Sequence, residues 1–325
     1  ASEATAFTGD ILVSNLNIAD LTGILAFKNI TKLDVSDNLL TNLNITLQSN
    51  LSILDCSNNN LESLDLSNNT NLIEINVASN SLETLNLKNG NTTAITSYNS
   101  ISNPRLVCVQ VDDVSYANIN FTNKDAITEF NTVCVKPIFV DVNATGTNDG
   151  SSWTNAYTDL GNALSSNSNS KFWIKEGTYI PNGNARNSRF IVTQNQKLYG
   201  GFVGTELTES QRDLNANPSI LSGDINGNDD GVISFNNASK SDNATNVLTI
   251  SGNNTLLDGL TISGGNANGS TAEFNQGAAI ISNTNVENIL LVNCVITDNT
   301  SNTGGTIKVV DSGINTDITF KNSVF

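Results

Sequence analysis

The chain repeats one short phrase at a fixed interval of 21 residues. Apolar residues and an asparagine recur in the order L-x-x-L-x-L-x-x-N-x-L, and successive copies align without a gap. A period of this length indicates a solenoid, whose coils stack their apolar positions into one core. We expect each asparagine to bond backbone groups that a tight bend leaves unpaired. The matching positions are Ile30, Leu33, Val35, Asn38 and Leu40, then Leu51, Leu54, Cys56, Asn59 and Leu61, then Leu72, Ile75, Val77, Asn80 and Leu82.

A weaker echo of the phrase follows half a period later. Its apolar pairs are Leu43 and Ile45, Leu64 and Leu66, and Leu85 and Leu87. A helix would need more residues and a period of about 3.6. The echo therefore predicts a second short extended segment on the opposite side of each coil.

The four cysteines fall into two kinds. Cys108 and Cys134 lie outside the repeat positions, in an irregular segment after the last coil. We predict a disulfide between them, which closes a loop of about 27 residues and stabilises the fold by roughly 3–4 kcal/mol. Cys56 occupies the apolar position of Val35 and Val77, and we interpret both it and Cys294 as small buried hydrophobes. One disulfide and two buried thiols favour an extracellular or periplasmic location.

The second half of the chain has a different texture, with Pro137 at the boundary. The stretch SSWTNAYTDLGNALSS, residues 151–166, predicts an amphipathic helix with Ser151 or Ser152 as its N-cap. Beyond about residue 246, short strands separated by Gly and Asn turns predict a parallel β-helix. We expect three regions: a repeat solenoid with a disulfide-bearing cap at 1–136, an N-terminal cap of the β-helix at 137–231, and β-helix coils at 232–325. The predicted register aligns Leu257, Leu260 and Ile262 with Leu291, Cys294 and Ile296, and with Phe320, Ser323 and Phe325.

Composition excludes several classes of function. The net charge is −16 and no basic run is present, which disfavours nucleic acid and anionic membranes as partners. The chain has no histidine, so a Ser–His or Cys–His nucleophile and a His-ligated metal are excluded. No stretch approaches the roughly 18 apolar residues of a membrane span, so we expect none. After residue 246 the acids are scattered singly and the basic residues are Lys308 and Lys321, so we assign no catalytic residue.

One loop resembles the start of an oxygen-rich calcium site. In SGDINGNDDGV, Asp224, Asn226, Asn228 and Asp230 stand at alternate positions, and Asp242 from the following turn could add a ligand. The sixth position is Asp229 instead of glycine, and the twelfth is Phe235 instead of glutamate. Any calcium site here is therefore expected to be weak, on the order of 10⁻⁴ M. The alternative is a turn whose side chains bond their own backbone.

Two outward columns cross the repeat coils. Lys32, Ile53 and Glu74 form one column, and Asp34, Asp55 and Asn76 form the other. They are candidates for a ligand-facing strip. The alternative is a solvated strand face with no ligand.

Both halves resemble known families. Residues 10–136 resemble the 21-residue leucine-rich repeat modules of secreted Bacteroidota proteins, especially flavobacterial ones, in IADLTGILAFKNITKLDVSDN and in the exit segments RLVCVQVDD and KDAITEFNTVCV. Residues 138–325 resemble right-handed parallel β-helix proteins of the same organisms, related to polymorphic outer-membrane proteins. The matching phrases are VDVNATGTNDGSSWTNAYTDL, KLYGGFVGTE, QRDLNANPSILSGDINGND and LDGLTISGGNAN.

The resemblance implies a mainly β fold, in which a short leucine-rich-repeat solenoid joins a right-handed parallel β-helix with an α/β N-terminal cap. Family members often carry a C-terminal type IX secretion signal. This chain contains none and stops within the strand-like DITFKNSVF, so we expect it to be a fragment.

Three functions are consistent with these patterns. The favoured one is a non-catalytic protein, secreted or on the outer surface of a Gram-negative bacterium, that acts as an adhesive or stalk module. Its partner would be an extracellular polysaccharide, a protein or another surface ligand, and it would need no cofactor apart from weak calcium. The second is a polysaccharide lyase or hydrolase whose catalytic coils lie outside this chain. The third is a cargo or subunit of an outer-membrane or type IX secretion assembly.

Overall fold

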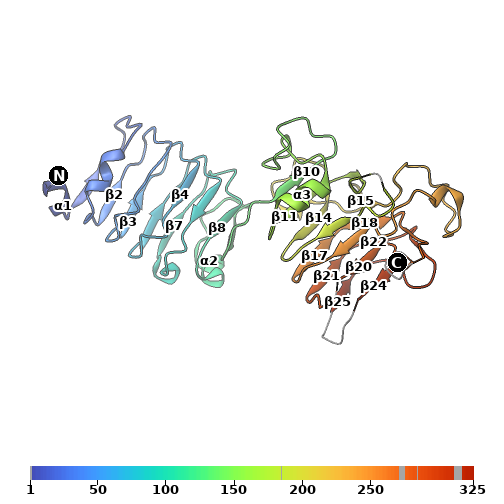
Figure 1. The fold of residues 1–325 in the computed structure, drawn as a ribbon. Coiled ribbons are helices and arrows are strands. Elements are labelled where there is room, and N and C mark those ends of the chain that lie inside the picture. The colour runs from blue at the N-terminus through green and yellow to red at the C-terminus, as the bar shows by residue number, and fades with distance from the viewer. Residues whose placement is uncertain (1, 184, 271–274, 284, 311–316) are drawn as a thin grey trace. The chain divides into compact units, whose positions relative to one another are not determined.

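The chain divides into two compact units, Ala1–Cys134 and Val135–Phe325, which we call unit 1 and unit 2. The computed structural model describes every residue except 1, 184, 271–274, 284 and 311–316. Both units consist mainly of short parallel strands, so the predicted mainly β class is confirmed (Figure 1). The division between the units falls just before the expected one at residue 137.

Unit 1 contains two parallel sheets with a shared apolar core. Paired strands are offset by the repeat period, so that Leu33 lies beside Leu54, and Leu54 beside Ile75. The first sheet has the order β1 (Asp10–Leu12), β2 (Lys32–Asp34), β3 (Ile53–Asp55), β5 (Glu74–Asn76) and β7 (Ser97–Asn99). The second has the order β4 (Ser63–Asp65), β6 (Thr84–Asn86), β8 (Cys108–Gln110) and β9 (Glu129–Asn131). The helical segments are α1 (Ser2–Ala6), η1 (Thr22–Ala26), η2 (Thr92–Ala94) and α2 (Val114–Asn120).

Each strand of unit 1 is three residues long because the chain must bend again almost at once. The middle residue of β3, Leu54, points inward and is buried, while Ile53 and Asp55 point outward. The bend after β3 passes through Asn58, whose φ of 53° lies in the left-handed region. Asn and Asp tolerate that region better than most residues. Asp37 and Ser79 take the same conformation one coil before and one coil after.

The asparagine of each repeat is buried and bonds backbone groups of two coils. The side-chain Nδ2 of Asn59 donates to the carbonyl oxygens of Cys56, Ser57 and Val35 at 3.0–3.2 Å. Its Oδ1 accepts from the backbone N–H of Leu40 at 2.9 Å. Asn80 bonds the next coil in the same way. This bonding confirms the predicted role of the repeat asparagine.

The C-terminal end of unit 1 is closed by a disulfide and an aromatic cluster. Cys108 and Cys134 are bonded, with their Cα atoms 5.8 Å apart, and this is the pair predicted from the sequence. Tyr98 stacks on Phe121 with ring centroids 4.6 Å apart, and Phe130 packs edge-on against both rings. These rings cover the last coil, which would otherwise expose its core.

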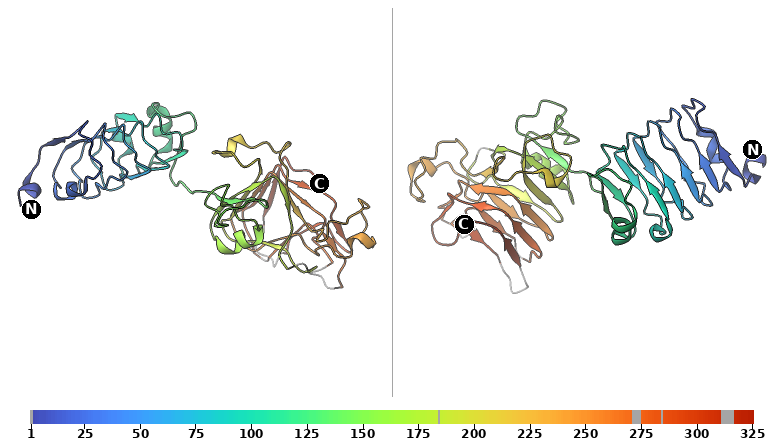
Figure 2. Two further views of the ribbon diagram at one scale, coloured as in Figure 1. Left: turned by 90° about the horizontal axis from the view of Figure 1, so that it is seen from above. Right: turned by 180° about the vertical axis from the view of Figure 1, so that it is seen from behind.

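Unit 2 contains three larger parallel sheets and one strand pair, and the strands of each sheet lie side by side (Figure 2). The first sheet has the order β10 (Ile138–Val140), β11 (Lys171–Lys175), β14 (Lys197–Phe202), β17 (Thr255–Asp258), β21 (Ile289–Val292) and β25 (Ile318–Lys321). The second has the order β12 (Gly177–Tyr179), β15 (Ser219–Ser222), β18 (Leu260–Ser263) and β22 (Val295–Ile296). The third has the order β13 (Phe190–Val192), β16 (Leu248–Ile250), β20 (Ile280–Ser282) and β24 (Ile307–Lys308), and β19 (Asn266–Ala267) pairs with β23 (Thr300–Ser301).

The register of unit 2 agrees with the one predicted from the sequence. Leu257 pairs with Leu291, which pairs with Phe320, and Ile262 pairs with Ile296. Leu257 and Leu291 are fully buried, so a shift of one residue would turn both toward solvent.

The predicted helix at residues 151–166 is wrong at its start. The helix α3 covers Leu160–Ser166, and Asp159 caps it by accepting from the N–H of Asn162 at 2.7 Å. The preceding residues are held by β10 instead: the N–H of Tyr157 donates to the carbonyl of Phe139 at 2.9 Å. Pairing with a strand outcompeted the helical periodicity of this segment. The 3₁₀ turns of unit 2 are η3 (Glu209–Gln211) and η4 (Ala238–Lys240).

Candidate functional site

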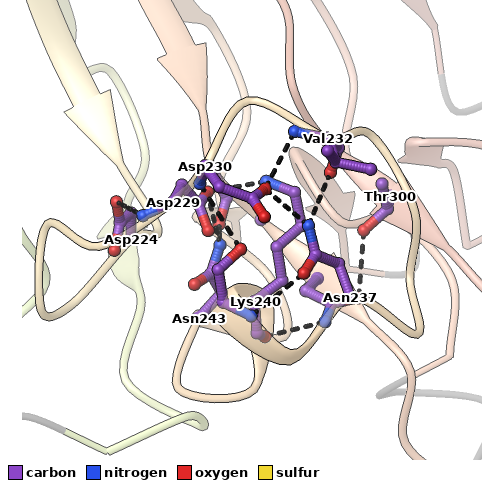
Figure 3. Close-up of polar contacts among 12 residues, drawn as sticks. Asp224, Asp229, Asp230, Val232, Asn237, Lys240, Asn243 and Thr300 are labelled. Carbon is purple, nitrogen blue, oxygen red and sulfur yellow. Dashed lines mark hydrogen bonds and ion pairs between the residues drawn. The ribbon is translucent and has the colours of Figure 1, made fainter.

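The longest elaboration of unit 2 is a loop between β15 and β16, residues 224–243, which we call the closed loop (Figure 3). Its two ends are joined by a hydrogen bond from the N–H of Ala244 to the carbonyl of Gly223 at 2.7 Å. Long loops with joined ends and internal packing are commonly functional. The closed loop also holds all five residues of the predicted calcium site.

A buried ion pair lies at the centre of the closed loop. Lys240 Nζ is 2.6 Å from Asp229 Oδ2, although the lysine side chain is only 1% exposed. Asn243 Nδ2 donates to the same carboxylate oxygen at 3.0 Å and to the carbonyl of Gly264 at 2.6 Å. Figure 3 shows these three side chains pointing toward one another. The chain thus keeps a charge out of water by pairing it inside a loop.

Arg186 fastens the closed loop to the neighbouring strands. Its guanidinium donates to the carbonyl of Asn243 and to the carbonyl of Asn266 at 2.9 Å, and to Asn268 Oδ1 at 2.6 Å. Burial lowers the pKa of Arg186. Asn266 in turn donates to the carbonyl of Lys240 at 2.8 Å and accepts from Thr300 Oγ1 at 3.0 Å. The closed loop is therefore tied to β19 and β23 by side chains.

The predicted calcium ligands bond backbone groups of their own loop. The Asp224 carboxylate accepts from the N–H groups of Asn228 and Asp229, both at 3.1 Å. Asp242 Oδ2 accepts from the N–H of Asn226 at 3.1 Å.

Asp230 is bonded in the same local way. Its carboxylate accepts from the N–H of Val232 at 3.0 Å and from Asn237 Nδ2. The bond from Val232 is the main cause that lowers the pKa of Asp230. Within the described part of the chain, no three Cys, Asp or Glu side chains are grouped to hold a metal. These contacts match the turn alternative, and calcium binding stays a prediction.

The predicted ligand face of unit 1 forms a continuous strip across the first sheet. Lys32 lies beside Ile53, which lies beside Glu74, and Asp34, Asp55 and Asn76 form the parallel column. Outward groups of β3, β5 and β7 line a shallow depression there. The second column is bonded internally: Asn76 Nδ2 donates to Asp55 Oδ2 at 3.0 Å. Asp34 and Asp55 each also accept from the serine two residues on.

The second sheet of unit 1 carries a matching strip that the sequence pattern did not predict. Ser63 lies beside Thr84 and Asp65 beside Asn86, and Asn86 Nδ2 donates to Asp65 Oδ1 at 3.0 Å. These residues and the disulfide line another shallow depression. The half-period echo located the inward residues of these strands, and its flanking positions could have identified the strip.

The nucleophiles and acids of the chain are held in unreactive states. Burial strongly raises the pKa of the Cys56 thiol, and it raises the pKa of Cys294 to about 11. Thiolates attack and thiols do not, so neither cysteine is activated. Asp258, an isolated acid of unit 2, is paired with Arg212 at 2.9 Å.

No family model matches the chain, and neither a curated protein nor a solved structure matches it significantly. Among the residues that the structure describes, no helix has the length and apolar character needed to cross a membrane.

Proposed function

We propose that this chain is a non-catalytic module of a secreted or cell-surface protein of a Gram-negative bacterium, serving as an adhesive or stalk. In this proposal unit 1 is a leucine-rich-repeat solenoid and unit 2 is a right-handed parallel β-helix with an N-terminal cap. The observation that carries the proposal is the bonding of the outward polar columns, in which Asn76 bonds Asp55 and Asn86 bonds Asp65 between coils.

This bonding supports a binding or presenting surface in preference to an active site. A general acid or base needs a carboxyl group that is free to exchange a proton with a substrate. Asp34 and Asp55 instead accept hydrogen bonds from their own turns. What the strips offer is a rigid row of carboxylates, amides and hydroxyls repeated once per coil. Such a row suits a long ligand with its own repeat, and an extracellular polysaccharide is the partner we favour.

The charge and the cysteines support the proposed location. A net charge of −16 opposes adsorption to anionic lipid and nucleic acid. The disulfide between Cys108 and Cys134 is of the kind that persists outside the reducing cytosol.

Retention of the purified chain on alginate, pectin and cellulose beads tests the proposal. We expect retention on at least one polymer, without release of unsaturated or reducing ends. The double variant Ile53→Arg, Glu74→Arg should weaken retention by at least about tenfold, because it changes adjacent side chains of the strip without altering the core. Thr84→Arg on the other sheet is the matched control. Equal retention of all three proteins would contradict a role for this strip.

Two other results would redirect the assignment. Polymer cleavage by the wild-type chain would support the lyase or hydrolase alternative. Failure to bind any polymer, combined with co-purification of an outer-membrane complex, would support the assembly-subunit alternative.

A further inference from the structure

The ion pair of the closed loop leaves several hydrogen-bonding groups unmet. Within the described residues, the Lys240 ammonium group has three N–H donors but bonds one acceptor, Asp229 Oδ2 at 2.6 Å. Asp229 Oδ1 is buried and accepts no hydrogen bond, and Asn243 Oδ1 is likewise buried and unpartnered. Two full charges held in this way would lack the additional bonds that normally offset the loss of hydration.

An amide would need fewer partners than the ion pair. It carries one N–H donor and one carbonyl oxygen, in place of three donors and two carboxylate oxygens. Asn243 Nδ2 already donates to Asp229 Oδ2 at 3.0 Å, which is the bond that a retained carbonyl oxygen would accept. Lys240 is 1% exposed, so its amine is shielded from competing water.

We propose that Lys240 and Asp229 are joined by an intramolecular isopeptide bond, a covalent modification of the closed loop. Burial favours the neutral pair, so a proton moves from Lys240 Nζ to Asp229 Oδ1. The neutral Nζ then attacks Asp229 Cγ, and the developing negative charge on Oδ2 is stabilised by the Asn243 amide. The bond from Cγ to Oδ1 breaks, and Oδ1 leaves as water with its own proton and one proton from the amine. No oxidant, reductant or cofactor is required.

The crosslink would close a loop between residues separated by 11 positions. It would hold the closed loop when the Arg186 hydrogen bonds break, and it lies in the unit that has no disulfide among the described residues. The proposal is independent of the proposed function, because it concerns how the loop is built and not what the chain binds.

The intact mass of the reduced and alkylated full chain tests the proposal directly. We expect a mass lower than the sequence mass by one water molecule. Trypsin should cut after Arg212 but not after Lys240, because an acylated lysine is not a trypsin site. The digest should therefore contain the peptide 213–308 minus water. A peptide of residues 213–240 at its full sequence mass would overturn the proposal.

Two variants separate this bond from another water loss. Lys240→Arg keeps the positive charge but cannot form the amide, and Asp229→Ala removes the acyl group; both should have the full sequence mass. Succinimide formation at Asp230–Gly231 also loses water, but it would persist in Lys240→Arg and reverse at mildly alkaline pH. Water loss that persists in Lys240→Arg would overturn the proposal. The wild-type digest distinguishes the bonded from the unbonded lysine even if a variant fails to fold.

Discussion

Units 1 and 2 both stack parallel strands and both carry a column of asparagines, but the two columns lie in different places. In unit 1 the column of Asn38, Asn59 and Asn80 is buried and bonds backbone carbonyls. In unit 2 the column of Asn169, Asn195, Asn254 and Asn288 lies at the surface, in turns with φ of 53–58°. Its members bond one another side chain to side chain at 2.8, 3.2 and 2.9 Å.

The difference explains why one unit has a constant period and the other does not. A buried asparagine must reach carbonyls in its own coil and in the coil before, which fixes the path between them. A surface asparagine needs only its neighbours in the column, so the rest of the coil is free to lengthen. Successive members of the surface column are 26, 59 and 34 residues apart, and the longest interval contains the closed loop.

The largest expected effect comes from the disulfide, which should separate the stability of the two units. Replacing Cys108 and Cys134 by serine should lower the unfolding free energy of unit 1 by about 3–4 kcal/mol. Both tryptophans, Trp153 and Trp173, are in unit 2. Urea unfolding followed by tryptophan fluorescence should therefore be unchanged, while the transition seen by circular dichroism shifts. A matching shift in fluorescence would show that the units unfold together.

The second prediction compares the two asparagine columns directly. Asn59→Ala should cost about 2–3 kcal/mol, because buried carbonyls and the N–H of Leu40 lose their partner. Asn254→Gly removes a surface side chain but tolerates the positive φ, so it should cost less than about 1 kcal/mol. Urea titrations of both variants give the two values. Equal costs would refute the distinction between buried and surface columns.

The third prediction concerns the closed loop that the variable period of unit 2 accommodates. Asp224→Ala should lower stability by about 1–2 kcal/mol, because two backbone N–H groups lose their acceptor. If the turn alternative holds, thermal unfolding of the wild type is the same with excess calcium and with chelator. A calcium-dependent rise in the wild type that is absent from Asp224→Ala would instead establish the metal site.

The smallest expected effect distinguishes the buried thiols of the two units. The pKa of Cys294 is raised from 9.0 to about 11, and burial raises that of Cys56 further. Alkylation of the native chain at pH 9 should therefore be slow at both sites and slower at Cys56. Faster reaction at Cys56 would contradict the tighter burial of unit 1.

The same thiols set a direction for the pH dependence of stability. Between pH 9 and 11 the unfolded Cys294 thiol loses its proton while the folded thiol keeps it. Its contribution to stability is therefore complete below pH 9 and declines as the pH rises toward 11. Unfolding of wild type and Cys294→Ser across this range measures the contribution, and parallel curves would exclude it.

The parts of the fold that repeat could be predicted from the sequence, and the parts that occur once could not. The register of Leu33, Leu54 and Ile75 follows from a period that leaves one alignment. The predicted start of α3 was wrong because Tyr157 pairs with β10, a contact that local periodicity does not encode. The pairing of Lys240 with Asp229 could not be predicted because it depends on how one irregular loop packs on itself.

The buried asparagine has a consequence for how a gene for unit 1 can change. Asn59 and Asn80 make equivalent bonds to equivalent atoms, so the junction between any two neighbouring coils is chemically the same. Unequal recombination that adds or removes 21 residues would rejoin matching surfaces and leave no new contact to optimise. Unit 1 can therefore change its length in whole coils, whereas each junction of unit 2 joins segments of unequal length and would have to be refitted.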